Sequence, residues 1–383
     1  MKITPRRLLV FGVPLVLAGV IGYQYFDLQQ NLNQGLAAYQ QGDCATALPR
    51  LNNVVNSSLF GAKNWIDEAQ APRAACFDFQ PAKDAQNAGN YGDALYKYFE
   101  LVVGKRDATL FPFVKAEVAK IFSEVPAAEW ATYDNCGWHN YKNIATYFDE
   151  EGMLPEPAKN IPALFYECGQ YLLNIESPRD IELFKAAESY IALLDQYPDH
   201  PLTLEVVSQL PQVMLDAARG YLENDNPAYK ADGMAMLTLL MERFPDHELA
   251  NEAEAQLAKV IAENATAQGA DQMPQPQAIA ISGTNAVVTI QNGSPTPIQV
   301  AISGPNDSVV DTLPECLACV QFTDSNAATC GAGVPSASYT LSPGTYQVTV
   351  SSLGDTIIPF YGSWRLDGGF EYPNCIFVVT TFQ

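Results

Sequence analysis

The chain has 383 residues, 48% of them hydrophobic, which is enough for two or three domains with cores of their own. Its formal net charge of -22 excludes nucleic-acid binding of the kind that needs a basic surface to neutralise phosphates. The first 26 residues contain Lys2, Arg6 and Arg7 but no acidic residue. An acidic body behind a short basic start is typical of exported proteins, although solubility alone explains the same charge.

The N-terminal segment Leu8–Phe26, LLVFGVPLVLAGVIGYQYF, carries no charge. It is long enough to cross a bilayer as a helix, and Tyr23, Tyr25 and Phe26 lie at its far end, where interfacial aromatic residues are favoured. Because the positive charges precede it, the positive-inside rule predicts a cytoplasmic stub and transmembrane anchor over residues 1–27. The bulk of the chain would then be periplasmic or otherwise extracytoplasmic.

A cleaved signal peptide is the competing interpretation of the same segment. No clean A-x-A site follows the apolar run, and the lipoprotein-like LAGV has Val20 where a lipidated cysteine is required. We therefore favour an uncleaved anchor. Both interpretations export the body of the chain, where disulfides form and persist.

Residues 28–262 are expected to be helical, because their apolar residues recur at helical spacing. Gln41–Val55 aligns with Ala88–Val102, so that Gly42, Ala47 and Leu48 match residues 47 positions later. Tyr197–Pro201 (YPDHP) and Phe244–Glu248 (FPDHE) have the same separation. These two turns are expected to start helices, with His200 and His247 in capping roles.

The segments GLAAYQQGDCATAL and AQNAGNYGDALYKYF resemble tetratricopeptide-type repeats. The resemblance lies in a helix that ends at a Gly-Asp or Gly-Asn turn and a second helix that opens with Ala-Leu. It implies an α-solenoid with a concave surface for a partner's peptide or helix. The 47-residue spacing exceeds the usual period of about 34, and residues 104–180 depart from the pattern.

Residues 263–277 are polar and rich in Pro, Gln and Ala, which predicts a linker. Over 278–383 the pattern changes to short β-branched runs separated by Gly, Pro, Asn and Ser. About seven such strands predict a small β-sandwich. The fold class is therefore multidomain α plus β: an N-terminal transmembrane helix, a helical repeat domain and a C-terminal β-sandwich domain.

The run YTLSPGTYQVTVSS resembles the hairpin of exported sandwich domains of the PEGA or carboxypeptidase-regulatory type, and FYGSWRLDGGFEYPNC resembles a module of uncharacterised bacterial envelope proteins. The resemblance implies no known chemistry. The aromatic residues of the second run are candidates for a glycan-facing platform, and the alternative is that they form a packed core: Tyr361, Trp364, Phe370 and Tyr372.

All eight cysteines are disulfide candidates in an exported chain. Cys44 and Cys76 have the same spacing as Cys136 and Cys168, which predicts two bonds between neighbouring helices. In the β domain, a Cys316–Cys319 bond would close a very tight loop. We therefore expect these two residues to reach Cys330 and Cys375, in an order that the sequence leaves open.

Two other uses of Cys316 and Cys319 are less favoured. A zinc site lacks a second paired ligand, and a redox pair needs a helix N-terminus rather than strands. Cys136 with His139 is a conceivable nucleophile and base, but no hydrolase, phosphate-loop or calcium motif is present. The sequence predicts no enzyme, no cofactor and no metal.

The predicted function is a membrane-anchored protein–protein interaction or scaffold protein of the cell envelope, with no nucleic-acid partner. The partner would be an envelope protein, bound in the helical groove or at an edge of the sandwich. The alternative is carbohydrate or cell-wall binding through the β domain.

Overall fold

The computed structural model describes residues 5–104, 107–129, 131, 136, 141–154, 161–319, 330–331, 333–353 and 358–377, without the side chains of 5–19, 21, 141–143 and 145. The chain forms two compact units. The first contains residues 1–178 and 188–206, and the second contains 179–187 and 207–383. Helices and mixed sheets together place the protein in a multidomain α plus β class.

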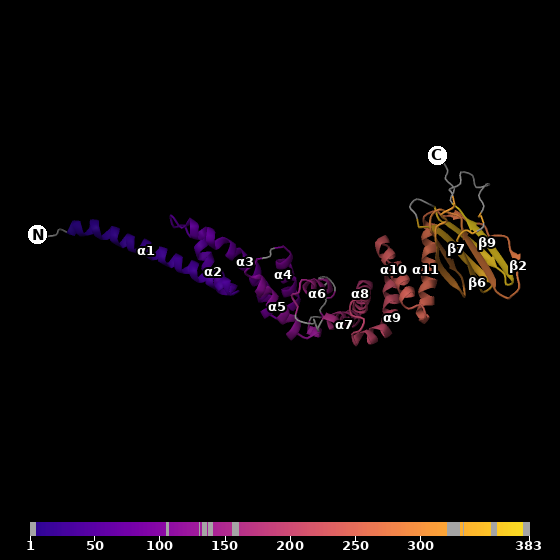
Figure 1. The fold of residues 1–383 in the computed structure, drawn as a ribbon, viewed down its shortest axis with the longest axis horizontal. Coiled ribbons are helices and arrows are strands. Elements are labelled where there is room, and N and C mark those ends of the chain that lie inside the picture. Colours follow the sequence, from indigo (N-terminus) through magenta and orange to yellow (C-terminus); the bar gives the residue numbers. More distant parts are fainter. Residues whose placement is uncertain are drawn as a thin grey trace, which may run out of the picture. The chain divides into compact units, whose positions relative to one another are not determined.

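The first unit is helical (Figure 1). Its elements are α1 (Pro5–Gln40), α2 (Cys44–Val55), α3 (Lys63–Asn87), α4 (Tyr91–Gly104), α5 (Phe111–Glu124), a 3-10 turn η1 (Ala127–Glu129), α6 (Tyr141–Glu150) and α7 (Ile161–Leu173). Two helices contain residues of both units: α8 (Asp180–Gln196) and α9 (Leu202–Glu223).

A membrane-spanning helix is predicted over Leu8–Phe26. Among the described residues, no helix has both the length and the apolar character needed to cross a membrane. The side chains before Val20, and that of Ile21, lie outside this description, so most of the predicted span does too.

The 47-residue repeat corresponds to two helical hairpins with the same turn. Gly42 and Gly89 have φ angles of +71° and +80°, a left-handed conformation that glycine adopts without strain. The following residue donates its N–H to a carbonyl five positions back in both turns: Asp43 to Ala38 and Asn90 to Ala85, each at 2.9 Å. Ala47 and Ala94 are fully buried, which lets each pair of helices approach closely.

The second repeated motif has the capping role that the sequence predicts. Nδ1 of His200 accepts the backbone N–H of Leu202 at 3.3 Å, and Nδ1 of His247 accepts that of Leu249 at 3.2 Å. Each histidine satisfies one of the orphan donors at the start of a helix. The FPDHE turn thereby defines the beginning of α11 (Glu248–Ala267).

Two disulfides link parts of the helical unit, with the partners that the 32-residue spacing predicts. Cys44–Cys76 joins the first residue of α2 to the middle of α3. Cys136–Cys168 joins residue 136 to α7. Both sulfurs of the first bond lie on buried residues.

The second unit combines helices with a two-layer β domain. The helices α10 (Pro227–Arg243) and α11 precede the strands β1 (Asp271–Gln272), β2 (Ile279–Ala280), β3 (Ala286–Asn292), β4 (Ile298–Ser303), β5 (Ser308–Leu313), β6 (Ser336–Leu341), β7 (Gly344–Ser352), β8 (Phe360–Leu366) and β9 (Phe370–Ile376). One sheet has the order β1-β8-β7-β4-β5 and the other β2-β9-β3-β6. The β3–β9 and β1–β8 pairs are parallel, and the other pairs are antiparallel.

The inner faces of the two sheets share one core, because alternate residues of each strand point inward. Strand β3 shows this alternation along its whole length, with Val288 and Ile290 fully buried. Val300 and Ile302 of β4 and Val348 of β7 contribute from the other sheet.

Helix α11 covers the outer face of the five-stranded sheet (Figure 1). Beneath it lie two small side chains that are directly opposite each other, Ala301 of β4 and Thr349 of β7, both almost completely buried. At the edge of this sheet, the Glu254 carboxylate of α11 accepts the N–H of Val310 in β5 at 3.0 Å. The helix therefore shields both a face and an edge of the sheet.

Residues 263–277 are part of this folded unit rather than a free linker. Helix α11 extends to Ala267, β1 pairs with β8, and Met273 is buried in the core. The Gln275 amide also exchanges two hydrogen bonds with the backbone of Arg365, at 2.7 and 2.9 Å. The segment is polar because its residues form hydrogen bonds with β8, and this polar composition led to the prediction of a linker.

Candidate functional site

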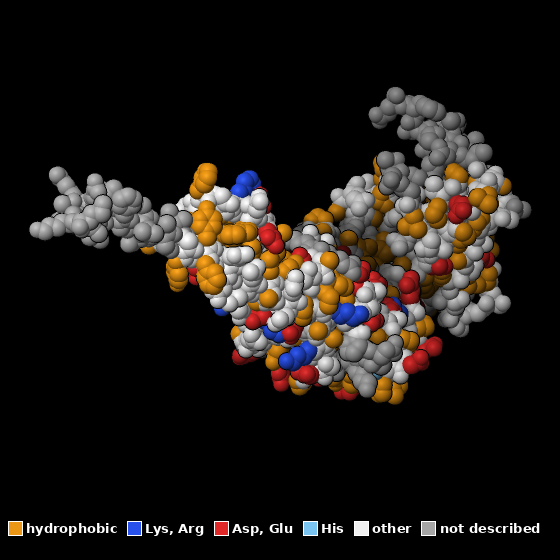
Figure 2. Space-filling view, turned by 60° about the vertical axis from the view of Figure 1, so that its left-hand side comes forward, with side chains coloured by type: hydrophobic (Ala, Val, Ile, Leu, Met, Phe, Trp, Pro, Cys, Tyr) orange, Lys and Arg blue, Asp and Glu red, His pale blue; other side chains and the backbone are white. Residues whose placement is uncertain are grey.

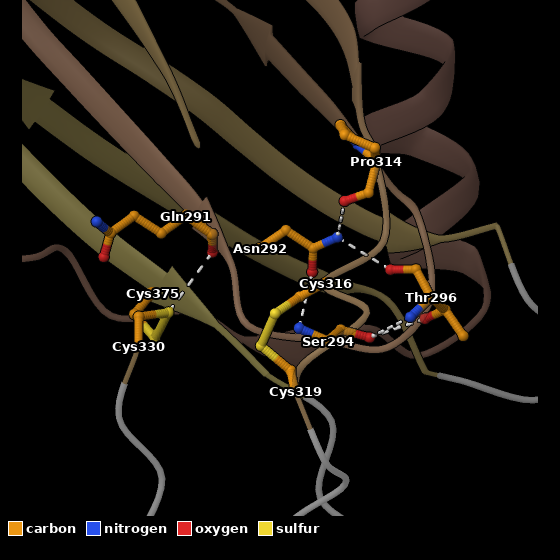
Figure 3. Close-up of a disulfide and its surroundings, with 9 residues drawn as sticks. All are labelled: Gln291, Asn292, Ser294, Thr296, Pro314, Cys316, Cys319, Cys330 and Cys375. Carbon is orange, nitrogen blue, oxygen red and sulfur yellow. Dashed lines mark hydrogen bonds between the residues drawn. A yellow bond between two sulfur atoms is a disulfide. The ribbon is translucent and has the colours of Figure 1, made fainter. Parts of the chain in front are cut away.

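Two disulfides lie at one end of the β domain, where β3 turns into β4 and β5 ends (Figure 3). Cys316 is bonded to Cys319 within the loop that follows β5, and Cys330 is bonded to Cys375 of β9. The backbone N–H of Cys316 donates to the Ser294 carbonyl at 2.9 Å, which ties the loop to the β3–β4 turn. This end of the domain is therefore fixed by covalent bonds as well as by hydrogen bonds.

The observed pairing differs from the prediction for these four cysteines. We expected Cys316 and Cys319 to reach Cys330 and Cys375, because a bond between the first two closes so short a loop. A tight turn brings the two cysteines within bonding distance. The Cys319 N–H donates to the Cys316 carbonyl at 3.0 Å, and the two Cα atoms are 5.2 Å apart. This Cα separation is within the ordinary range for disulfides. The same bond removes the two thiolates that a zinc site here would require.

Asn292 organises the β3–β4 turn from the inside. Its side chain is completely buried. Its amide nitrogen donates to the carbonyls of Thr296 at 3.0 Å and Pro314 at 2.7 Å, and its amide oxygen accepts the N–H of Ser294 at 2.9 Å (Figure 3). One side chain thus satisfies three backbone groups that belong to two separate loops.

Gly293 allows the same turn to pass close to the second disulfide. A Cβ atom at this position would lie 3.0 Å from Sγ of Cys330 and 3.1 Å from the Ile376 carbonyl oxygen. The Gly293 N–H donates to that carbonyl at 2.7 Å. A side chain at this position would fit only if the disulfide or the last strand moved by a few tenths of an ångström, so glycine favours this close approach.

Three exposed aliphatic side chains project from the loops at this end. Leu317, within the loop closed by Cys316–Cys319, is 90% exposed. Leu353 and Ile358 of the β7–β8 loop are both 54% exposed, and the Leu353 N–H donates to the Pro297 carbonyl at 3.0 Å. We call these three residues the apolar loop end. Loops held by a rigid scaffold are common positions for binding residues.

The predicted glycan-facing aromatic residues are mostly part of the core. Trp364 and Tyr372 are almost fully buried, and the Trp364 indole N–H donates to the Met273 carbonyl at 3.3 Å. The Tyr372 hydroxyl accepts the N–H of Asp367 at 2.8 Å. Tyr361 is half-buried and donates to the Gln347 side chain, and Phe370 is packed partly against the core. These residues do not form an exposed aromatic platform.

Asp307 and Tyr346 form a hydrogen-bonded pair at the opposite end of β4. The Asp307 carboxylate accepts the Ser342 N–H at 2.7 Å and the Tyr346 hydroxyl at 3.0 Å. The backbone hydrogen bond from Ser342 is the main cause that lowers the pKa of Asp307, and the hydroxyl of Tyr346 adds to it. Burial, followed by the hydrogen bond to Asp307, raises the pKa of Tyr346 to about 12. This pair fixes the turn between β4 and β5 and is remote from the disulfides.

Other candidate residues do not assemble into a reactive site. Cys136 is bonded to Cys168 and so is not a nucleophile, and His139 lies outside the described residues. Within the described ranges, no group of three or more His, Cys, Asp or Glu side chains is placed to hold a metal ion.

Sequence reasoning missed Asn292, Gly293 and Leu317. The signal for the first two was present, since Asn-Gly-Ser after an alternating run is a strong indication of a turn. Nothing in the sequence distinguishes Leu317 from a core leucine. No protein family matches the chain, and no curated protein or solved structure does so either.

Proposed function

We propose that this chain is an exported protein, held at a membrane by its N-terminal apolar run, that binds another envelope protein through the apolar loop end of its β domain. The pairing of the cysteines carries the proposal of export. All eight cysteines belong to disulfides, and none is free in the described residues. Such disulfides persist in oxidising compartments and are rare in the cytosol.

The geometry of the loops supports a binding role. Leu317 is exposed to solvent on a loop that the Cys316–Cys319 bond closes. Asn292 binds both this loop, at Pro314, and the β3–β4 turn, at Ser294. A preorganised loop loses little conformational entropy when it binds, and an exposed aliphatic side chain gains free energy when a partner covers it. The repeated helical hairpins supply a scaffold of the kind that carries protein-binding surfaces.

Export is tested by counting thiols. The full chain is isolated from its native membranes, alkylated before and after reduction, and weighed by mass spectrometry. We expect no alkylation before reduction and eight modified cysteines afterwards. Free thiols before reduction would contradict an oxidising compartment.

Binding is tested by a photo-reactive amino acid placed at Leu317 in living cells. A matched control carries it at Asn306, an exposed residue of the β4–β5 turn at the other end of the sandwich. We expect one protein adduct at position 317 that disappears in a Leu353→Asp background, and none at 306. Equal labelling at both positions would contradict a specific site. Retention on cell-wall polymer that is lost in Tyr361→Ala would favour the carbohydrate alternative instead.

A further inference from the structure

Five aromatic residues gather around one level of α1, just where the apolar run of the sequence ends: Tyr23, Tyr25, Phe26, Phe60 and Trp65. We call them the aromatic collar. Tyr23 is 70% exposed, Phe26 is 65% exposed, and Phe60, in the loop between α2 and α3, is 95% exposed. The Tyr25 and Trp65 rings meet edge to face with centroids 5.9 Å apart.

The fold brings the α2–α3 loop to this level because α2 runs back along α1. The Arg50 side chain donates to Gln34, and a Cβ on Gly35 would lie 2.8 Å from the Leu51 side chain. Continuing the same antiparallel register pairs Tyr25 with Phe60. The Tyr25 hydroxyl donates a hydrogen bond to the Phe60 carbonyl, in agreement with this register. The chain therefore leaves the end of the apolar run, turns at Gly42 and returns to the height at which it started.

The returning segment has the composition of a membrane-facing loop. Between Arg50 and Lys63 the sequence LNNVVNSSLFGA has no charged residue. Gly61, with a φ of +86°, permits the sharp turn that leaves the Phe60 ring pointing away from the hairpin. The Lys63 side chain next to the loop is 81% exposed and is paired with the Asp67 carboxylate at 2.6 Å, so the charges nearest to the loop form an ion pair at the start of α3.

We propose that the aromatic collar is a second membrane contact, with the Phe60 loop inserted into the headgroup region of the bilayer beside the anchoring helix. The proposal rests on the membrane anchor of the proposed function. Phenyl and indole rings at a bilayer surface are stabilised by partial burial of their apolar faces. Two contacts with the membrane would fix the tilt of the first unit, whereas a single span leaves the unit free to rotate about the helix axis. Figure 2 shows hydrophobic side chains gathered at one end of this unit.

The test uses tryptophan emission from the full chain in vesicles of phosphatidylcholine and phosphatidylglycerol that carry bromine on their acyl chains. In a Trp65→Phe background, in which Trp130, Trp138 and Trp364 remain, the emission that Phe60→Trp adds to that of this parent reports on the loop. The matched control is Gln41→Trp at the far turn of the same hairpin, roughly 24 Å along the helix axis. We expect bromine near the glycerol to quench Phe60→Trp several-fold more than Gln41→Trp, and bromine near the chain ends to quench it less.

Flotation of the same vesicles separates the two proposals. If the chain floats with the lipid but Phe60→Trp is quenched no more than Gln41→Trp, the collar is overturned and the anchor stands. If the chain does not float, both are overturned. Cross-linking of position 60 to a second copy of the chain, without quenching, would assign the surface to self-association and overturn the lipid contact.

Discussion

At the scale of single residues, the loops of the β domain depend on a few polar side chains that bind backbone groups. Asn292 satisfies three backbone groups from two loops without contact with water. Asp307 performs the equivalent task at the other end of β4, where it accepts hydrogen bonds from Ser342 and Tyr346. Both are short side chains whose replacement would leave backbone groups unsatisfied.

Asn292→Ala should destabilise the β domain by about 3 kcal/mol, because the carbonyls of Thr296 and Pro314 and the N–H of the buried Ser294 would lose their partner. Denaturant unfolding of the oxidised protein measures the change. Asn251→Ala, at an exposed position of α11, is the matched control and should change the free energy of unfolding by less than about 0.5 kcal/mol. Equal effects of the two substitutions would show that Asn292 does not hold the turn.

Asp307 should make stability fall as the solution is acidified. Its folded-state pKa lies below its ordinary value, so the unfolded chain binds the proton more readily. The contribution is complete above the ordinary carboxyl pKa and is lost as pH falls through the lowered one. Asp307→Asn should therefore lose less stability than wild type between about pH 6 and pH 3. Urea midpoints across this range measure the difference, and Asp232→Asn controls for the removal of one exposed charge.

At the scale of elements, α11 excludes water from the outer face of the five-stranded sheet. The helix covers Ala301 and Thr349, so a hydroxyl group that would be hydrated on an open sheet is fully buried. Among the described residues, Oγ1 of Thr349 has no hydrogen-bond partner. Burial of an unpaired hydroxyl costs free energy that a methyl group of the same size does not.

Thr349→Val should therefore stabilise the second unit by about 1 kcal/mol, since valine has nearly the same shape and a high strand propensity. Thermal unfolding in parallel with wild type measures the shift. Thr345→Val, at an exposed position of the same strand, gains strand propensity without this burial and should have the smaller effect. A destabilised Thr349→Val would mean that the hydroxyl makes a compensating bond.

The sequence predicts correctly those features that depend on neighbouring residues, and it fails for features that depend on distant parts of the chain. The Gly42 and Gly89 turns and the His200 and His247 caps depend on a few neighbouring residues, so repetition in the sequence reveals them. The pairing of Cys316 and the burial of Trp364 depend on where distant strands lie. The polar run 263–277 misleads for the same reason, because its partners in β8 lie about 90 residues further along the chain.

At the scale of the whole molecule, the two disulfides of the β domain differ in the length of chain that they close. Cys330 and Cys375 are separated by 45 positions, and Cys316 and Cys319 by 3. Loop-closure entropy predicts that replacing the first pair by serine costs about 2 kcal/mol more than replacing the second. Denaturant midpoints under oxidising conditions measure both. After full reduction the variants and wild type should converge, and persistent differences would point to packing rather than cross-linking.

The position of β9 between β2 and β3 has a consequence for how the chain is made. Synthesis proceeds from the N-terminus, so Cys316, Cys319 and Cys330 are all present before Cys375, and three thiols can then pair wrongly. The Cys316–Cys319 bond needs only its own short turn and can form at once. We expect this bond to keep Cys316 and Cys319 from mispairing, so that Cys330 is the one unpaired cysteine of the β domain until β9 is synthesised.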